Sequence, residues 1–246
     1  GVDPYVPRAG SVLTIPLQTL LPDAPREGLV LNIAELRLYY YPPGQNSVTV
    51  YPIGIGQLGG DTLTPTMVTT VSDKRANPTW TPTANIRARY KAMGIDLPAV
   101  VPAGPNNPMG HHAIRLAAYG GVYLLHGTNA DFGIGMRVSS GCIRLRDADI
   151  KSLYNKITPG TRVNIINEPI KVSVEPNGTR LVEVHQPLSE HINDDPQTLP
   201  IVLNASMKNF KQAPQTNQQV MESAMALRSG MPVDVTHHQL SAEQAL

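Results

Sequence analysis

The sequence contains few of the residues that cross-link a fold or fill its core with large rings: one cysteine, one tryptophan and two phenylalanines among 246 residues. A lone cysteine excludes an intramolecular disulfide, and with it the disulfide framework of many small secreted proteins. The formal net charge of +1 and the lack of any basic run argue against a nucleic-acid-binding surface. No apolar stretch approaches the ~18 residues of a membrane span, and residues 1–4 lack the features of a signal peptide. We therefore expect neither a nucleic-acid partner nor a transmembrane segment.

Proline and glycine are abundant, with 23 and 20 residues, and they interrupt the chain throughout. This balance favours short strands joined by turns over helical bundles. A chain of this length can bury one sizeable core and a small second unit. We expect a mainly β fold with one dominant domain and appendages.

Short apolar runs bounded by turn residues predict most of the strands, at residues 29–31, 36–41, 47–55, 67–71, 113–116, 122–125 and 162–166. Helices are predicted at 84–93, where Ile86, Tyr90 and Met93 share one face, and at 147–157. Residues 52–56 are rich enough in glycine to let another backbone approach closely.

The composition changes beyond residue 169. The turn Asn177-Gly178 predicts a hairpin formed by residues 171–175 and 179–185. Residues 189–200 form a polar linker in this prediction, residues 216–228 a helix, and the glutamine-containing end from His237 a frayed tail.

One histidine and the only cysteine stand where catalytic side chains are often found. His126 ends the apolar run of residues 122–125, and Cys142 follows the turn Ser139-Ser140-Gly141, where backbone amides become free to point at a ligand. A nearby imidazole lowers the pKa of a thiol and accepts its proton, so the pair suffices for acyl transfer. The competing interpretation is a buried structural cysteine and an unrelated histidine.

At these residues the sequence resembles a known family. His-Gly-Thr-Asn at 126–129 and Ser-Ser-Gly-Cys-Ile-Arg-Leu at 139–145 are similar to the L,D-transpeptidase catalytic domain of the YkuD type. The similarity is closest to the enterobacterial periplasmic enzymes that attach Braun's lipoprotein to peptidoglycan. The resemblance implies a periplasmic location, with the signal segment absent from this sequence.

The resemblance also implies a division of the chain. Residues 26–168 are expected to form a YkuD-like β-sandwich or barrel catalytic domain with short helices, and residues 169–246 a small α+β appendage. Residues 1–25 resemble the remnant of a LysM module followed by a linker. A remnant this short cannot fold alone, so we do not expect it to bind glycan.

Roles for the motif residues follow from the same resemblance. Cys142 is the implied nucleophile and His126 its base, with the Gly127 carbonyl fixing the imidazole tautomer. The amides of Gly141 and Cys142, and of Ser140, are the implied oxyanion hole. Many family members have histidine where this chain has Ser140, and the effect of that exchange stays open.

Substrate contacts are implied for two further residues. Arg144 has the planar fork that grips a carboxylate of the peptide stem, with a structural salt bridge as the alternative. Trp80, in a loop rich in proline and threonine, belongs either to the core or to the wall of the substrate cleft. The adjacent His111 and His112 lack metal-ligand spacing, so we expect no metal and no cofactor.

The implied reaction is a two-step acyl exchange on peptidoglycan tetrapeptide stems through a thioester, with carbapenems as expected inhibitors. The acceptor is the C-terminal lysine of the outer-membrane lipoprotein in the closest relatives, a second stem in enzymes that form 3→3 cross-links, or water in an L,D-carboxypeptidase. A peptidoglycan-binding module without activity is the alternative outside enzymes. Papain-like hydrolases usually place cysteine before histidine, the reverse of the order seen here.

Overall fold

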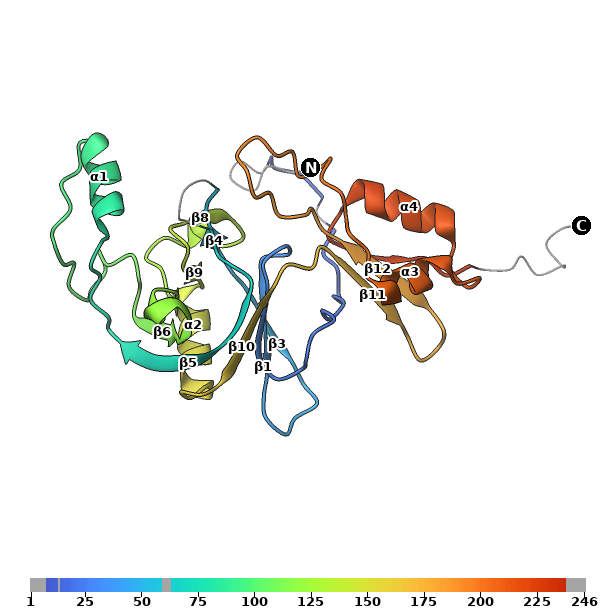
Figure 1. Cartoon of the computed structure of the whole chain (residues 1–246), viewed down its shortest axis with the longest axis horizontal. Coiled ribbons are helices and arrows are strands. Elements are labelled where there is room, and N and C mark those ends of the chain that lie inside the picture. Colours follow the sequence, from blue (N-terminus) through green and yellow to red (C-terminus); the bar gives the residue numbers. More distant parts are fainter. Residues whose placement is uncertain (1–7, 13, 59–62, 238–246) are drawn as a thin grey trace, which may run out of the picture. The chain divides into compact units, whose positions relative to one another are not determined.

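The computed structural model describes residues 8–12, 14–58 and 63–237 (Figure 1). The chain forms two compact units. The first comprises residues 24–168 and 187–199; it contains the segment predicted to be a catalytic domain, so we call it the catalytic unit. The second, the C-terminal unit, comprises residues 169–186, the described part of 200–246, and the described residues before 24. No helix in the described part of the chain is long and apolar enough to cross a membrane.

The catalytic unit is built on one sheet of eight strands in the order β3-β2-β1-β10-β5-β6-β7-β9. The strands are β1 (Gly28–Asn32), β2 (Arg37–Tyr41), β3 (Thr49–Pro52), β5 (Met67–Ala76), β6 (His112–Leu116), β7 (Leu124–His126), β9 (Ile143–Arg144) and β10 (Arg162–Ile166). The short strands β4 (Ile55–Gly56) and β8 (Arg137–Ser139) pair separately. The hairpin of β1 and β2 and the mainly β fold confirm the expectation from the sequence.

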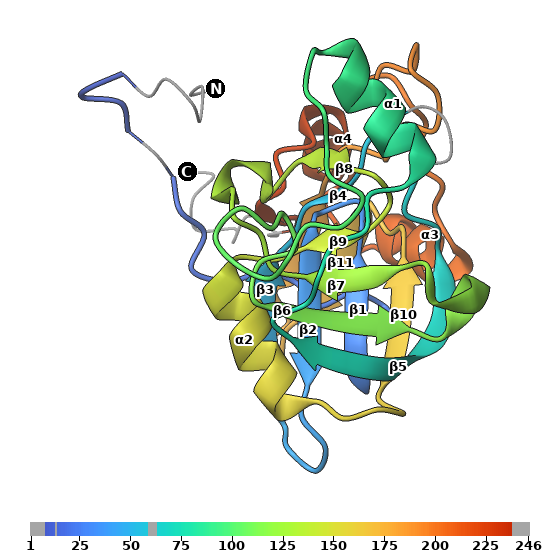
Figure 2. The same cartoon turned by 90° about the vertical axis from the view of Figure 1, so that its left-hand side faces the viewer.

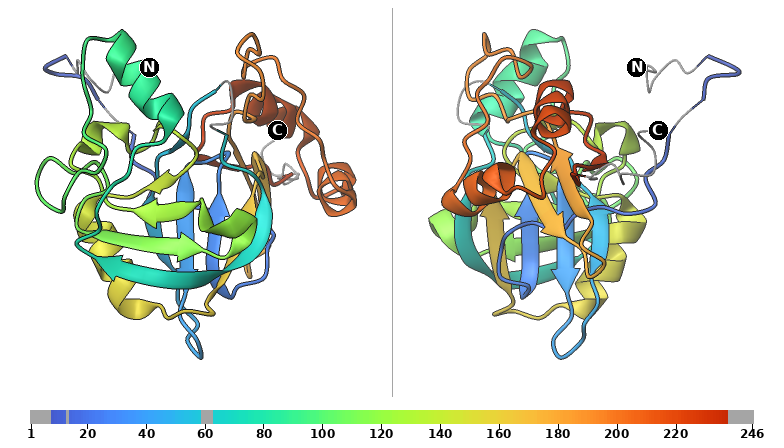
Figure 3. Two further views of the ribbon diagram at one scale, coloured as in Figure 1. Left: turned by 60° about the vertical axis from the view of Figure 1, so that its left-hand side comes forward. Right: turned by 90° about the vertical axis from the view of Figure 1, so that its right-hand side faces the viewer.

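Strand β5 joins the two halves of this sheet. Residues 67–70 pair with β10, whereas residues 71–76 pair with β6, and the register shifts between Val71 and Asp73. Such an irregularity bends a strand, and β5 curves visibly around the sheet in Figure 3. We predicted only residues 67–71 as strand, because the second half of β5 is mostly polar and does not alternate apolar with polar residues.

The core of the catalytic unit lies between the sheet and helix α2 (Asp147–Lys156). Leu29, Leu31 and Val163 contribute apolar side chains from the sheet, and Ile150 and Leu153 contribute them from the helix; all five are fully buried. Helix α2 contacts β6 and β7, as Figure 2 shows. The helix predicted at 147–157 is confirmed, and it supports the strands that carry the motif residues.

Helix α1 (Ala84–Ala92) begins where the sequence predicted, with the Thr83 hydroxyl accepting a hydrogen bond from the Ile86 amide. None of its residues is buried, however. The face shared by Ile86, Tyr90 and Met93 is therefore not packed in the core. Ile86 and Tyr90 line the cleft described below, so this face of the helix borders a ligand space.

The C-terminal unit contains the predicted hairpin, β11 (Ile170–Val174) and β12 (Arg180–Val184), and the predicted helix α4 (Gln218–Leu227). It also contains helix α3 (Ala205–Gln212) and strand β13 (Pro232–Asp234), which were not predicted. Both are short, and whether such a segment forms a helix or a strand depends on long-range partners. Helix α3 buries Met207 and Phe210, and β13 pairs with β12.

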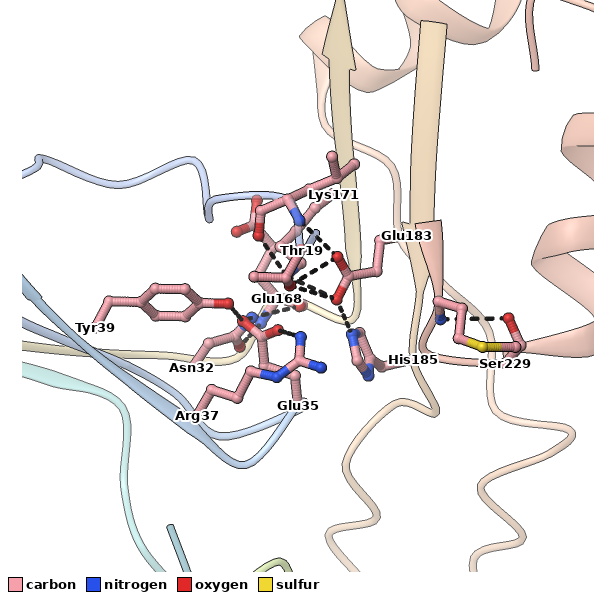
Figure 4. A network of polar contacts seen from close by, with 12 residues as sticks. Thr19, Asn32, Glu35, Arg37, Tyr39, Glu168, Lys171, Glu183, His185 and Ser229 are labelled. Atoms are coloured by element: carbon pink, nitrogen blue, oxygen red, sulfur yellow. Dashed lines mark hydrogen bonds and ion pairs between the residues drawn. The ribbon is translucent and has the colours of Figure 1, made fainter. Parts of the chain in front are cut away.

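A buried charge pair lies within the C-terminal unit (Figure 4). The Glu183 carboxylate and the Lys171 ammonium are 3.0 Å apart, and both side chains are fully buried. Glu183 also accepts hydrogen bonds from the Thr19 hydroxyl and the Leu20 amide, while Lys171 donates to the Leu20 carbonyl. Residues 19 and 20, expected to belong to a linker, are therefore held by this pair.

Candidate active site

The two motif residues come from neighbouring strands. β7 and β9 run parallel, with Leu125 opposite Ile143 and His126 opposite Arg144. Cys142 directly precedes β9, so the sheet brings it close to His126. Both side chains line one cleft with a volume of about 630 Å³. The sheet thus assembles residues that are separated in the sequence by the whole glycine-rich loop.

The hydrogen bond of His126 defines its tautomer. Its Nδ1 atom lies 2.6 Å from the Gly127 carbonyl oxygen, which can only accept, so Nδ1 carries the proton. The other ring nitrogen, Nε2, is then the free acceptor. Burial lowers the pKa of His126 to about 4, even though the Gly127 carbonyl favours the protonated form. At neutral pH the ring is a neutral base.

The thiol environment differs from the expectation. Burial raises the pKa of Cys142, and this effect exceeds the opposing influence of a backbone hydrogen bond and of the positive charges of Arg144 and Arg115. The expected low-pKa thiolate is therefore wrong for the free protein. The reason is desolvation, which the sequence does not reveal. The resting site holds a neutral thiol, which donates to the Val122 carbonyl oxygen at 3.8 Å, and a neutral imidazole in the same cleft.

Hydrogen bonds hold the loop that carries the cysteine. Gly141 has φ of +99°, a conformation that favours glycine. Its carbonyl accepts from the Thr64 hydroxyl at 2.9 Å, and the same hydroxyl accepts from the Gly56 amide at 3.0 Å. The Ser139 hydroxyl donates to the Cys142 carbonyl at 2.5 Å. With these carbonyls held, the peptide planes on both sides of the nucleophile are fixed.

Thr64 was missed in the sequence analysis. It lies 77 residues before Gly141 in a threonine- and proline-containing loop. No local pattern distinguishes it from its threonine neighbours, so only the fold identifies its role.

Gly54 supports the other side of β9. Its amide donates to the Arg144 carbonyl and its carbonyl accepts from the Arg144 amide, both at 2.8 Å. A Cβ atom at Gly54 would collide with the Gly133 carbonyl oxygen. The expectation that glycines at 52–56 let another backbone approach is therefore confirmed.

The Arg144 side chain lines the cleft without a carboxylate partner among the described residues. Its Nε atom is buried and has no hydrogen-bond partner in the described part of the chain. Burial lowers the pKa of Arg144, which marks a desolvated cation. This arrangement differs from the structural salt bridge considered as the alternative.

Helix α1 and the loops beside it form another wall of the cleft. Arg89 donates to the Ser140 hydroxyl at 3.4 Å, a long contact that links α1 to the cysteine loop. Trp80 is partly exposed and lines the cleft, while its backbone pairs with Val101. Tyr90 lies in the same wall.

Charged residues complete the cleft: Asp73 and Arg75 from β5 and Arg115 from β6. They were missed because they are scattered in the sequence and belong to no motif. Among the described residues, the cleft holds no group of three His, Cys, Asp or Glu side chains whose ligand atoms converge.

Comparison with known proteins identifies both parts of the chain. Residues 26–165 match the L,D-transpeptidase catalytic domain, and residues 169–235 match the L,D-transpeptidase C-terminal domain. The family expected from the motif is thereby confirmed.

Two proteins of Escherichia coli strain K12 are similar along almost the whole chain. Probable L,D-transpeptidase YcfS is 84% identical over 243 residues, which are 99% of this chain and 76% of that protein. Probable L,D-transpeptidase YbiS is 53% identical over 235 residues, 95% of this chain and 76% of that protein. A solved L,D-transpeptidase 3 from Mycobacterium tuberculosis covers 56% of this chain and 60% of its own, with a TM-score of 0.39 and 18% identity. Since the catalytic-domain model covers more than half of the chain and the E. coli relatives align along nearly all of it, the chain belongs to the L,D-transpeptidase family.

Proposed function

We propose that the enzyme transfers the acyl group of a peptidoglycan tetrapeptide stem through a thioester on Cys142. One observation carries the proposal: His126 and Cys142 line the same cleft from neighbouring strands, and the Gly127 carbonyl leaves Nε2 of His126 as the acceptor. A nucleophile and an oriented base in one cleft are the parts that acyl transfer requires.

The first half-reaction follows from the protonation states. Sγ of Cys142 attacks the carbonyl carbon at the L-centre of the third stem residue, diaminopimelate, while Nε2 of His126 takes the thiol proton. The oxyanion is stabilised by the amides of Gly141 and Cys142, with that of Ser140 beside them. The C–N bond to the terminal D-alanine then breaks, and the protonated imidazole gives its proton to the leaving amine. A base with a pKa of about 4 returns this proton readily.

The second half-reaction regenerates the thiol. An acceptor amine attacks the thioester, and His126 removes the amine proton. The C–S bond breaks and the sulfur recovers a proton from the imidazole. No other base is required, because one imidazole serves both directions in turn.

Donor recognition rests on the excess of positive charge in the cleft. Arg144 is desolvated and has no carboxylate partner among the described residues, and Arg89 lies near it. A stem peptide carries several carboxylates, which guanidinium groups bind with two parallel hydrogen bonds. Trp80 and Tyr90 supply apolar surface beside them.

The proposed acceptor is the C-terminal lysine of the outer-membrane lipoprotein. Asp73, the one acidic side chain among the described residues that line the cleft, is paired with Arg75 at 3.1 Å, so the cleft favours an acceptor amine that arrives neutral. The motif similarity to lipoprotein-anchoring enzymes supports the same acceptor. A second stem, giving 3→3 cross-links, or water, giving an L,D-carboxypeptidase, would use the same thioester. Periplasmic location and acylation by carbapenems belong to this proposal.

Mass spectrometry of purified muropeptides tests the function. The protein is incubated with tetrapeptide stems, with and without a peptide that ends in lysine, and with Cys142→Ala as the control. We expect a thioester mass on the wild type and an adduct of stem and peptide, neither of which the control forms. Dimers of stems alone would contradict the acceptor, and adducts made by the control would contradict the nucleophile.

A further inference from the structure

Two glycines and one carboxylate meet behind His126. Gly110, which precedes β6, and Gly127, which follows β7, both lie against the side chain of Asp147, the first residue of α2. A Cβ atom built on either glycine would be 2.5 Å from Oδ1 of Asp147. The carboxylate therefore occupies the space that side chains would take at both glycines.

Asp147 is also bound to the start of β6. Its Oδ1 accepts from the His111 amide at 2.9 Å, and its Oδ2 lies 2.7 Å from Nδ1 of His111. Asp147 has 35% of its side chain exposed and His111 has 57%. A histidine–carboxylate contact this exposed adds little to stability, so its geometry matters more than its energy.

This cluster touches the peptide group that orients the base. The Gly127 amide donates to the His112 carbonyl at 3.0 Å, one residue beyond His111. A Cβ atom on Gly110 would be 2.9 Å from the Gly127 carbonyl carbon and 2.8 Å from the Thr128 nitrogen, so Gly110 packs directly on this peptide plane. The plane that presents the Gly127 oxygen to His126 is thus enclosed on several sides.

We propose that Asp147 and His111 are positioning residues, which clamp Gly110 against Gly127 and thereby hold the Gly127 carbonyl toward Nδ1 of His126. Neither side chain is among the described residues that line the cleft. They act by fixing the peptide group whose carbonyl oxygen, that of Gly127, selects the tautomer of His126. The inference rests on the proposed catalytic role of His126, and it adds a carboxylate to a site whose base is otherwise oriented by backbone alone.

The test compares Asp147→Ala and His111→Ala with Asp149→Ala. Asp149 lies in the same first turn of α2, and no described hydrogen bond joins its Oδ2 to another residue, so its variant controls for loss of a carboxylate at the helix N-terminus without loss of the clamp. For each protein, ¹⁵N NMR of the resting enzyme reports which ring nitrogen of His126 is protonated. Steady-state kinetics with a tetrapeptide donor gives kcat and KM.

We expect Asp147→Ala to lower kcat about 10- to 100-fold with KM changed less than about twofold, because the base is misoriented while the donor-binding arginines remain. The His126 spectrum should change from a single Nδ1-protonated form to a mixture of tautomers. His111→Ala, an exposed substitution that leaves the fold intact, should produce a smaller change in the same direction.

Two results would overturn the clamp: an unchanged His126 spectrum in the folded Asp147→Ala and His111→Ala variants, or the same loss in Asp149→Ala. The spectrum is measured without substrate and so decides the clamp independently. If the wild type formed no thioester while the spectrum still changed in Asp147→Ala, the proposed function would fail and the clamp would stand.

Discussion

Gly54 and Arg144 exchange two backbone hydrogen bonds of 2.8 Å, and this exchange holds the strand that starts one residue after the nucleophile. Gly54→Ala would drive a Cβ atom into the Gly133 carbonyl oxygen, a backbone atom that cannot rotate away. We expect a loss of about 1–3 kcal/mol in the free energy of unfolding, measured by urea denaturation, and a fall in activity per folded molecule.

Gly44→Ala is the control for that variant. Gly44 has φ of +71° and open space around it, far from any site residue in the sequence. It should lose stability through backbone strain while activity per folded molecule stays at the wild-type value. Full activity in folded Gly54→Ala would show that the exchange with Arg144 does not position the loop.

The free energy of unfolding should depend on pH through the protonation of His126. Its pKa is about 4 in the folded protein and near 6.5 when unfolded, so the unfolded chain binds more protons between these values. Stability should therefore decrease as pH falls from about 6.5 to about 4, by up to about 3 kcal/mol. Chemical denaturation of wild type and His126→Gln across this range measures the difference. Parallel curves for the two proteins would mean that the histidine is not desolvated.

Thiol reactivity should be low in the free enzyme. Because burial raises the pKa of Cys142, iodoacetamide at pH 7 should alkylate it more slowly than it alkylates free cysteine. Activity should nevertheless persist at pH 6, since the neutral imidazole removes the proton during attack. A plateau of alkylation reached below pH 8 would instead indicate a preformed thiolate.

Arg144→Lys should separate charge from geometry. Lysine keeps the positive charge and loses the planar fork, so we expect the donor KM to rise about 10- to 100-fold, equivalent to one charge-assisted interaction of about 1.5–3 kcal/mol. Arg146→Ala is the control, because Arg146 is exposed and absent from the described cleft lining. An unchanged KM in Arg144→Lys would show that a positive charge suffices without the fork, and an equal rise in Arg146→Ala would show that the effect is not specific to the cleft.

The Lys171–Glu183 pair gives a prediction for the C-terminal unit. Burial alone would raise the pKa of Glu183, but contacts with His185 and Lys171 lower it overall, so the carboxylate is charged. Lys171→Met should cost up to about 3–5 kcal/mol of unfolding free energy, because it removes the buried ammonium group 3.0 Å from the Glu183 carboxylate. The double variant Lys171→Met with Glu183→Leu should recover part of that loss in the same denaturation assay. No recovery would mean that the hydrogen bonds to residues 19 and 20 outweigh the charge pair.

Local patterns predicted much of the fold because they reflect local causes. The hairpin of β1 and β2, helix α2 and the Asn177-Gly178 hairpin each follow from short-range periodicity or a turn dipeptide. The second half of β5 and helix α3 depend instead on partners distant in the sequence. The same division applies to the site. The motif indicated Cys142, whereas the role of Thr64 could be identified only from the fold.

The error about the thiol has a physical origin. The imidazole and the loop amides, which the sequence indicates, favour a thiolate. How far the cleft excludes water cannot be read from the sequence. Desolvation acts through every neighbouring atom, and in this site it exceeds the neighbouring charges.

The double pairing of β5 has a consequence for how the catalytic unit opens. One continuous strand supplies hydrogen bonds to β10 along residues 67–70 and to β6 along residues 71–76. No loop separates the two sets of pairs, so an opening that starts in one half must end inside a continuous strand, where it disturbs the pairs of the other half. In amide hydrogen exchange, the strands beside the nucleophile and the hairpin of β1 and β2 should therefore exchange as a single cooperative unit, and local fraying should be confined to the loops that border the cleft.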